Sequence, residues 1–270
     1  MIKQAIIPLA GLGTRLLPLT SVIPKELLPI NGKPGLEYIL DECIKSGIKE
    51  VILIISKKKQ SIKKYFYNDS FYKKLIKKKK NKKLIAEYKK IKKYKKMIKF
   101  VYQNSPRGTG DAVLRCKGLI KSNFFLMLMP DDLIIKNNCS KSMIRLHNKY
   151  KSSVIASKSV KKENVSRWGI FDIKKINKKI FVIKDVIEKP TTKEAPSRYA
   201  VIGRYILSKK IFPILKKQRP GINGEIHITD SIRTLISMEN KFIGHIFSGK
   251  YLDCGSMNGY INSTLQISKL

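Results

Sequence analysis

Short apolar runs alternate with amphipathic segments along this 270-residue chain, and the alternation restricts its possible folds more than any other feature of the sequence. Strands separated by helices pair in parallel, because each helix carries the chain back across one face of the sheet. The sequence therefore predicts an α/β protein with a mixed, mostly parallel sheet flanked by helices. Strands are expected at residues 2–7, 51–55, 98–102 and 124–129, with helices at 35–46, 57–66, 109–119 and 140–149.

Strand signals dominate the chain after residue 150. The length suits a single domain that covers residues 1–270. A lysine-rich stretch at 71–99 carries spaced apolar residues, which predict a basic amphipathic helix or a helical pair. In the second half we expect strands at 154–156, 169–173, 180–187, 200–207 and 242–247, and helices at 209–216, 225–238 and 257–268.

The formal charge of +38 raises the question of nucleic-acid binding. Lysine greatly outnumbers arginine, Ile, Asn and Tyr are frequent, and the aromatic pattern of an RNA-recognition motif is absent from the sequence. Drift toward A/T-rich codons explains this mixture without selection for binding. We therefore expect nonspecific adhesion to polyanions and no specific nucleic-acid partner.

Composition also predicts the cellular compartment. No apolar run approaches the ~20 residues of a membrane span, and the first residues lack a signal-peptide pattern. The four cysteines and three histidines are scattered without the spacing of a zinc site. We expect reduced, buried cysteines and a cytoplasmic protein without a membrane partner.

Residues 8–29 combine a glycine loop with fixed cations. Gly11 and Gly13 follow an apolar run and let backbone N–H groups approach a polyphosphate closely, while Arg15 and Lys25 can neutralise phosphate oxygens. The spacing fits neither a P-loop nor a dinucleotide-binding fingerprint. The segment therefore predicts a nucleoside triphosphate site of another kind.

The blocks Ala-Gly-Leu-Gly-Thr-Arg and Pro-Lys-Glu-Leu-Leu-Pro in this segment resemble the N-terminal signature of the sugar nucleotidyltransferases, most closely the bacterial UTP–glucose-1-phosphate uridylyltransferases. Relatives that make dTDP- or ADP-sugars usually carry a longer loop and often lack the acid matching Glu26, so the resemblance favours uridine. It implies a Rossmann-like fold, with a nucleotide-binding part at about 1–135 and a sugar-binding part at about 136–270. It also implies a homo-oligomer, either a dimer or a tetramer.

The resemblance implies a set of nucleotide-binding residues. Gln103 is the best candidate for reading uracil, and the residue that follows the Gly-x-Gly block is Asp111, where the family commonly has histidine. That departure leaves the local hydrogen bonding open. The implied nucleotide-binding residues are Ala10, Gly11, Gly13, Thr14, Arg15, Lys25, Glu26, Gln103, Gly108 and Gly110.

Carboxylates that could hold Mg²⁺ come directly after a predicted strand. Mg²⁺ is commonly held by one or two carboxylates together with substrate phosphates. The resemblance assigns the metal to Asp131, while Asp132 is expected to be a loop or helix-capping group. Asp253, in Leu-Asp-Cys-Gly, resembles a second metal contact, with a turn aspartate as the alternative.

The sugar phosphate is expected at a second group of blocks. Val-Ile-Glu-Lys-Pro contains Glu188 and Lys189, and the resemblance gives this lysine the phosphate of the sugar. Gly169, Gly203 and Glu225 lie in three further matching blocks, although Trp168 replaces the tyrosine common in the family and Gly224 replaces an aspartate. The residues implied to bind the sugar phosphate are Gly169, Glu188, Lys189, Gly203 and Glu225.

The implied reaction is Mg²⁺-assisted, in-line attack of glucose 1-phosphate on UTP, which gives UDP-glucose and pyrophosphate. Arg15, Lys25, Asp131 and Lys189 are the implied catalytic residues. No general base is needed, because the attacking phosphate oxygen is already anionic near neutral pH. Two alternatives stay open: the same chemistry with another nucleotide or sugar 1-phosphate, such as dTTP, and a basic nucleic-acid-binding protein on an enzyme-like fold.

Overall fold

One long sheet runs through both halves of the chain in the computed structural model, which describes residues 2–79, 81–221 and 224–269. Within these residues the sheet has nine strands, in the spatial order β5-β4-β1-β6-β11-β8-β12-β10-β9. Their bounds are β1 Gln4–Pro8, β4 Glu50–Ile55, β5 Ile98–Tyr102, β6 Phe124–Leu128, β8 Ser153–Ser159, β9 Gly169–Asn177, β10 Ile180–Glu188, β11 Tyr199–Ser208 and β12 Phe242–Ile246.

Strand direction divides the sheet into two regions. The neighbours β5, β4, β1 and β6 all pair in parallel. Beyond them, β11 runs antiparallel to both β6 and β8, β8 pairs in parallel with β12, and β10 is antiparallel to β12 and β9. The predicted mixed α/β sheet is confirmed, with its continuous parallel part in the first half of the chain.

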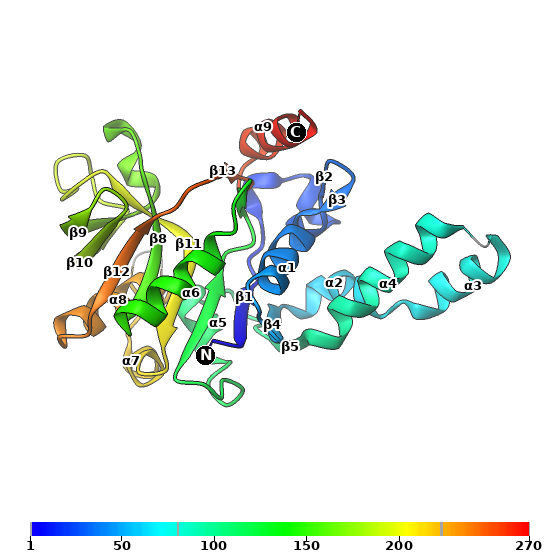
Figure 1. Ribbon diagram of the computed structural model, residues 1–270, viewed down its shortest axis with the longest axis horizontal. Helices are drawn as coiled ribbons and strands as arrows, with labels where there is room; N and C mark the ends of the chain where they lie inside the picture. The colour runs from blue at the N-terminus through cyan, green and yellow to red at the C-terminus, as the bar shows by residue number, and fades with distance from the viewer. Residues whose placement is uncertain (1, 80, 222–223, 270) are drawn as a thin grey trace.

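Helices cover both faces of this sheet (Figure 1). Alternate residues of a strand point to opposite faces, so a strand buried on both sides is apolar throughout. In β4, Val51, Leu53 and Ile55 pack in one apolar cluster, and Ile52 and Ile54 in another. The first cluster includes residues of α1 (Gly35–Lys45), α2 (Gln60–Tyr67) and α6 (Cys139–Tyr150), and the second residues of α5 (Thr109–Leu114), α7 (Ile211–Lys217) and α8 (Ile228–Ser237).

A helical pair extends away from the sheet, as predicted for the lysine-rich stretch. Figure 1 shows α3 (Asp69–Lys79) and α4 (Lys82–Met97) projecting from the body. No side chain of α3 is buried, whereas α4 buries Ile91, Tyr94 and Met97 where it returns to the sheet. Tyr72 and Tyr88 stack between the two helices, with their ring centroids 5.4 Å apart.

Two small sheets were not predicted. One joins β2 (Pro29–Ile30) to β3 (Lys33–Pro34). The other joins β7 (Asp132–Ile135) to β13 (Lys250–Asp253), and its register places Asp132 opposite Asp253. The final helix, α9 (Met257–Ser268), follows β13 directly. The second small sheet therefore brings the end of the chain to the segment that follows β6.

The helix predicted at 225–238 begins three residues late, at Ile228. The preceding segment instead forms backbone hydrogen bonds with the start of α5 and the loop before it. The N–H of Ile226 donates to the carbonyl of Arg107 at 2.9 Å, and the N–H of Gly110 donates to the carbonyl of Ile226 at 2.7 Å. The helix predicted at 109–119 ends at Leu114 and continues as turns.

All four cysteines are buried with free thiols, as expected. Among the described helices, none combines the length and apolar character that crossing a lipid bilayer requires.

Candidate active site

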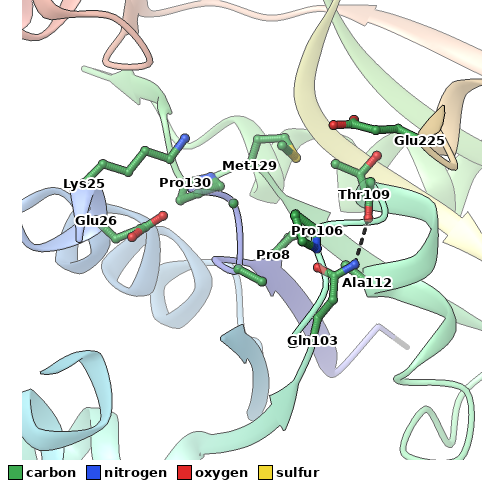
Figure 2. Close-up of a pocket in the computed structure, with 13 residues that line it drawn as sticks. Pro8, Lys25, Glu26, Gln103, Pro106, Thr109, Ala112, Met129, Pro130 and Glu225 are labelled. Atoms are coloured by element: carbon green, nitrogen blue, oxygen red, sulfur yellow. Dashed lines mark hydrogen bonds between the residues drawn. The ribbon is translucent and has the colours of Figure 1, made fainter. Parts of the chain in front are cut away.

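A pocket of about 150 Å³ opens at the carboxyl ends of β1, β5 and β6. In an open α/β sheet, ligands bind at this edge of the strands. Figure 2 shows Lys25 and Glu26 on one side of the pocket and Gln103, Thr109 and Glu225 on the other. Six residues predicted to bind nucleotide line it, namely Ala10, Gly11, Lys25, Glu26, Gln103 and Gly108. Gly13, Thr14, Arg15 and Gly110 lie outside the lining.

The two loop glycines do different things. Gly13 has a φ of +73°, which disfavours other residues, and it precedes the short 3₁₀ helix Thr14–Leu16. Thr20 donates its hydroxyl to the carbonyl of Gly13 at 2.8 Å and so closes the turn. Gly11 is exposed, and a Cβ there would meet no atom within 4 Å. Gly13 therefore shapes the loop, while Gly11 leaves the backbone open to a ligand.

Gln103 is held tightly at the opposite wall. Its side-chain nitrogen donates to the carbonyl of Gly108 at 3.1 Å and to Oδ2 of Asp111 at 2.7 Å. Gly108 has a φ of +94°, and a Cβ there would lie 2.6 Å from the carbonyl oxygen of Ile226. The glycines of this block are therefore required by close packing against residues 225 and 226.

Lys25, which lines the first pocket, forms an ion pair with Asp131, with 2.6 Å between Nζ and Oδ2. Burial disfavours the charged form of Lys25, but Asp131 and then Glu26 outweigh that effect and raise the pKa of Lys25. Burial likewise opposes ionisation of Asp131, yet the charge of Lys25 holds the pKa of Asp131 below its usual value. Both groups are therefore charged at neutral pH.

Glu26 makes a buried ion pair of its own. Both carboxylate oxygens accept from Nζ of Lys59, at 3.0 and 2.9 Å. Burial lowers the pKa of Lys59, although Glu26 opposes this shift. Glu26 therefore ties the segment of Lys25 to the start of α2 as well as lining the pocket.

Three charged groups converge at Gly255. The point that a Cβ would occupy there is 3.0 Å from Oδ2 of Asp131, 3.1 Å from Oδ1 of Asp253 and 3.2 Å from Nη2 of Arg15. Arg15 thus lies beside the two carboxylates although it does not line the first pocket. Asp253 is the last residue of β13, its Oδ1 accepting from the N–H of Gly255 at 2.9 Å and its Oδ2 from Arg167 at 3.0 Å.

A second pocket, of about 250 Å³, adjoins the first and shares Thr109, Met129 and Glu225 with it. All five residues predicted to bind the sugar phosphate line this second pocket: Gly169, Glu188, Lys189, Gly203 and Glu225. Lys189 has a φ of +47°, a conformation that non-glycine residues adopt rarely and that clusters at functional sites. A Cβ at Gly203 would lie 2.4 Å from Oδ2 of Asp132, so only glycine fits there.

Residues 4–269 match the model of a protein family described as nucleotidyl transferase. The chain belongs to this nucleotidyl transferase family. It is 37% identical over 273 residues to a UTP–glucose-1-phosphate uridylyltransferase of Streptococcus pyogenes, a match that covers 98% of this chain and 88% of the relative. It is 32% identical over 269 residues to the enzyme of the same name from Pseudomonas aeruginosa, covering 98% and 95%.

The structural comparison agrees with the sequence relatives of this nucleotidyl transferase. A crystal structure of UDP-glucose pyrophosphorylase complexed with UDP-glucose superposes with a TM-score of 0.89 at 36% identity. The match covers 100% of this chain and 99% of that one. The two pockets therefore lie in a nucleotidyl transferase fold that is shared along the whole chain.

The carboxylates of Asp131 and Asp253 are groups of this nucleotidyl transferase that could hold a divalent metal ion. Asp131 and Asp253 present oxygens to a common space that Gly255 leaves open, and oxygen is the ligand that Mg²⁺ prefers. Among the described residues, no group of three or more His, Cys, Asp or Glu side chains could hold a metal ion. Proteins commonly supply one or two carboxylate ligands to Mg²⁺, and substrate phosphates and water molecules complete its octahedral coordination.

Asp132 is neither a loop residue nor a helix cap, so that expectation was wrong. It is the first residue of β7, and it accepts from the hydroxyl of Tyr251 at 2.6 Å and from the N–H of Gly203 at 2.8 Å. Burial, together with the charge of Asp131, raises the pKa of Asp132 to about 6. Asp132 lines the pocket that also contains Lys189, and it connects β7 to β11 and β13.

Sequence reasoning gave no role to Arg204, whose side chain is fully buried. Its guanidinium donates to Glu42 through Nε and Nη2 at 2.9 to 3.1 Å, and through Nη1 to the carbonyls of Met129 at 3.2 Å and Gly203 at 2.9 Å. Met129 and Gly203 both line the second pocket. A lone arginine inside the apolar run of β11 was the available signal.

Proposed function

We propose that this chain transfers a uridylyl group from UTP to glucose 1-phosphate, giving UDP-glucose and pyrophosphate. The observation that carries the proposal is that two pockets adjoin and share Thr109, Met129 and Glu225, the first lined by six of the residues predicted to bind nucleotide and the second by all five predicted to bind the sugar phosphate. The relatives named above carry the same activity in their names.

In this proposal the base of UTP lies against Gln103, and its phosphates extend past the glycine loop toward Lys25. Arg15 and Lys25 stabilise the charge of the departing pyrophosphate, because fixed cations are most effective where negative charge develops. Asp131 and Asp253 hold Mg²⁺, which supplies charge neutralisation of the phosphates when it is bound. We assign the nucleotide to about residues 1–135.

The glucose 1-phosphate occupies the second pocket, formed mainly by residues 136–270. Lys189 holds its phosphate and offsets the repulsion between the two anionic substrates. Glu225 and Glu188 accept hydrogen bonds from the sugar hydroxyls, while Gly169 and Gly203 let the ring approach the backbone. One phosphate oxygen attacks the α-phosphorus of UTP, the bond from that phosphorus to the bridging oxygen breaks, and pyrophosphate leaves with the electron pair.

A pyrophosphate-release assay with purified protein tests the function. We expect release only when UTP, glucose 1-phosphate and Mg²⁺ are all present, and a clear preference for UTP when triphosphates compete. A preference for dTTP would replace uridine by thymidine, and no release with any triphosphate would reject nucleotidyl transfer. We further propose a cytoplasmic homo-oligomer, a dimer or tetramer, without a specific nucleic-acid partner.

A further inference from the structure

Gln103 can present either end of its amide to a ligand, and its surroundings decide which end. The amide nitrogen points at two acceptors, Oδ2 of Asp111 at 2.7 Å and the carbonyl of Gly108 at 3.1 Å. Figure 2 shows the oxygen of Gln103 on the side away from the bond to Gly108. A flipped amide would set its oxygen against both acceptors, so the flip costs two hydrogen bonds and adds repulsion.

Asp111 is itself fixed, so its carboxylate cannot turn away. It is buried, with 8% of its surface exposed, and Oδ2 also accepts from Nε of Arg115 at 2.9 Å, one helical turn along α5. Because an ionised carboxylate only accepts hydrogen bonds, it dictates that Gln103 turns its nitrogen toward it. The remaining group of the amide, Oε1, is then the one available to a ligand in the pocket.

A bare carbonyl oxygen distinguishes pyrimidine bases. Uracil carries a donor, N3–H, on its Watson–Crick edge, whereas cytosine has an acceptor at N3. Gln103 Oε1 accepts from the first and repels the second. A site that is built to hydrogen-bond one N–H group strongly rejects a ligand without it, because a buried polar group is otherwise left unpaired.

We infer that Asp111 is a positioning residue that sets the base specificity, holding the Gln103 amide so that its oxygen meets uracil and excludes cytosine. The inference rests on the proposed function, in which the base lies against Gln103.

The experiment compares kcat/KM for UTP and CTP in pyrophosphate release, together with binding of each triphosphate by calorimetry. Asp111→Leu removes the shorter of the two hydrogen bonds that orient the amide and leaves the carbonyl of Gly108 as the remaining acceptor, so turning the amide costs less and the UTP/CTP ratio should fall by about tenfold. Asp111→Asn keeps an oxygen where Oδ2 stands and should retain most of the ratio. Asp111→Ala replaces the leucine variant if that variant does not fold.

The matched control is Asp185→Leu, which removes another aspartate paired with an arginine, Arg233, at 3.0 Å on β10 and α8. It should leave the ratio unchanged. The inference is overturned if Asp111→Leu leaves the UTP/CTP ratio unchanged, even when kcat/KM falls equally for both triphosphates. It is also overturned if the ratio falls as far in Asp111→Asn as in Asp111→Leu. The wild-type protein is measured first. No release with UTP would reject the proposed function, whereas release with UTP and CTP at equal efficiency would overturn this inference alone.

Discussion

Replacing Arg204 by methionine should destabilise the protein strongly. The guanidinium is fully buried and forms an ion pair with Glu42, so the substitution leaves a buried carboxylate without its counter-charge. Breaking a buried ion pair in this way costs about 3–5 kcal/mol. For a chain of this size that corresponds to a fall in Tm of roughly 6–20 °C.

The cost is below the full penalty of an isolated buried charge, because Glu42 keeps hydrogen bonds from the N–H and hydroxyl of Ser140. Urea unfolding followed by circular dichroism and by the fluorescence of the single tryptophan, Trp168, measures the change. The double variant Arg204→Met with Glu42→Met should lose less free energy than the sum of the two single variants, because the charges act as a pair.

Arg233→Met is the matched control. This arginine pairs with Asp185 at 3.0 Å, but 58% of its side-chain surface is exposed, so the loss should stay below about 1 kcal/mol. If Arg204→Met costs no more than this control, or if the double variant is simply additive, the buried pair is not a unit and the reasoning is wrong.

Three further outcomes are expected. In steady-state assays, Lys189→Ala should raise KM for glucose 1-phosphate and lower turnover while leaving KM for UTP nearly unchanged. An equal rise in KM for both substrates would contradict the assignment of Lys189 to the sugar phosphate. Asp131→Asn should impair the magnesium dependence of the rate, and near-normal rates at limiting metal would contradict a metal role. Burial lowers the pKa of His245 to about 4. The unfolded chain therefore binds a proton at this histidine that the folded protein excludes as the pH falls from 6.5 to 4, so the contribution of His245 to the free energy of unfolding should fall by about 2–3 kcal/mol over that range. Asp132 has the opposite effect in the same range, so the check is the difference between the wild-type protein and His245→Leu, which should show this fall.

Most of the main sheet could be predicted because its strands and helices carry local periodic signals. The residues 51–55 are apolar at every position, as expected for a strand covered on both faces, and the structure confirms this strand as β4. The five residues predicted to bind the sugar phosphate come from four separate blocks, and the fold brings all five into the lining of one cavity. Their binding role stays a prediction.

Other features depend on contacts that no local pattern records. β7 and β13 have four residues each and lie more than a hundred positions apart, so neither the pairing nor the place of Asp132 could be predicted. Glu42 and Arg204 are 162 positions apart, and each reads as an ordinary charged residue until the fold brings them together. The late start of α8 has the same origin, since it follows from backbone bonds to residues 107 and 110.

The position of β11 has a consequence for how the substrates are aligned. This strand hydrogen-bonds to β6 on one side and to β8 on the other, and its Gly203 contacts both Met129 and Asp132. The pockets proposed for UTP and for glucose 1-phosphate are therefore built on one continuous sheet instead of on two separate domains. If the two substrates occupy these pockets as proposed, their relative position is set mainly by the hydrogen-bonded strands of one sheet.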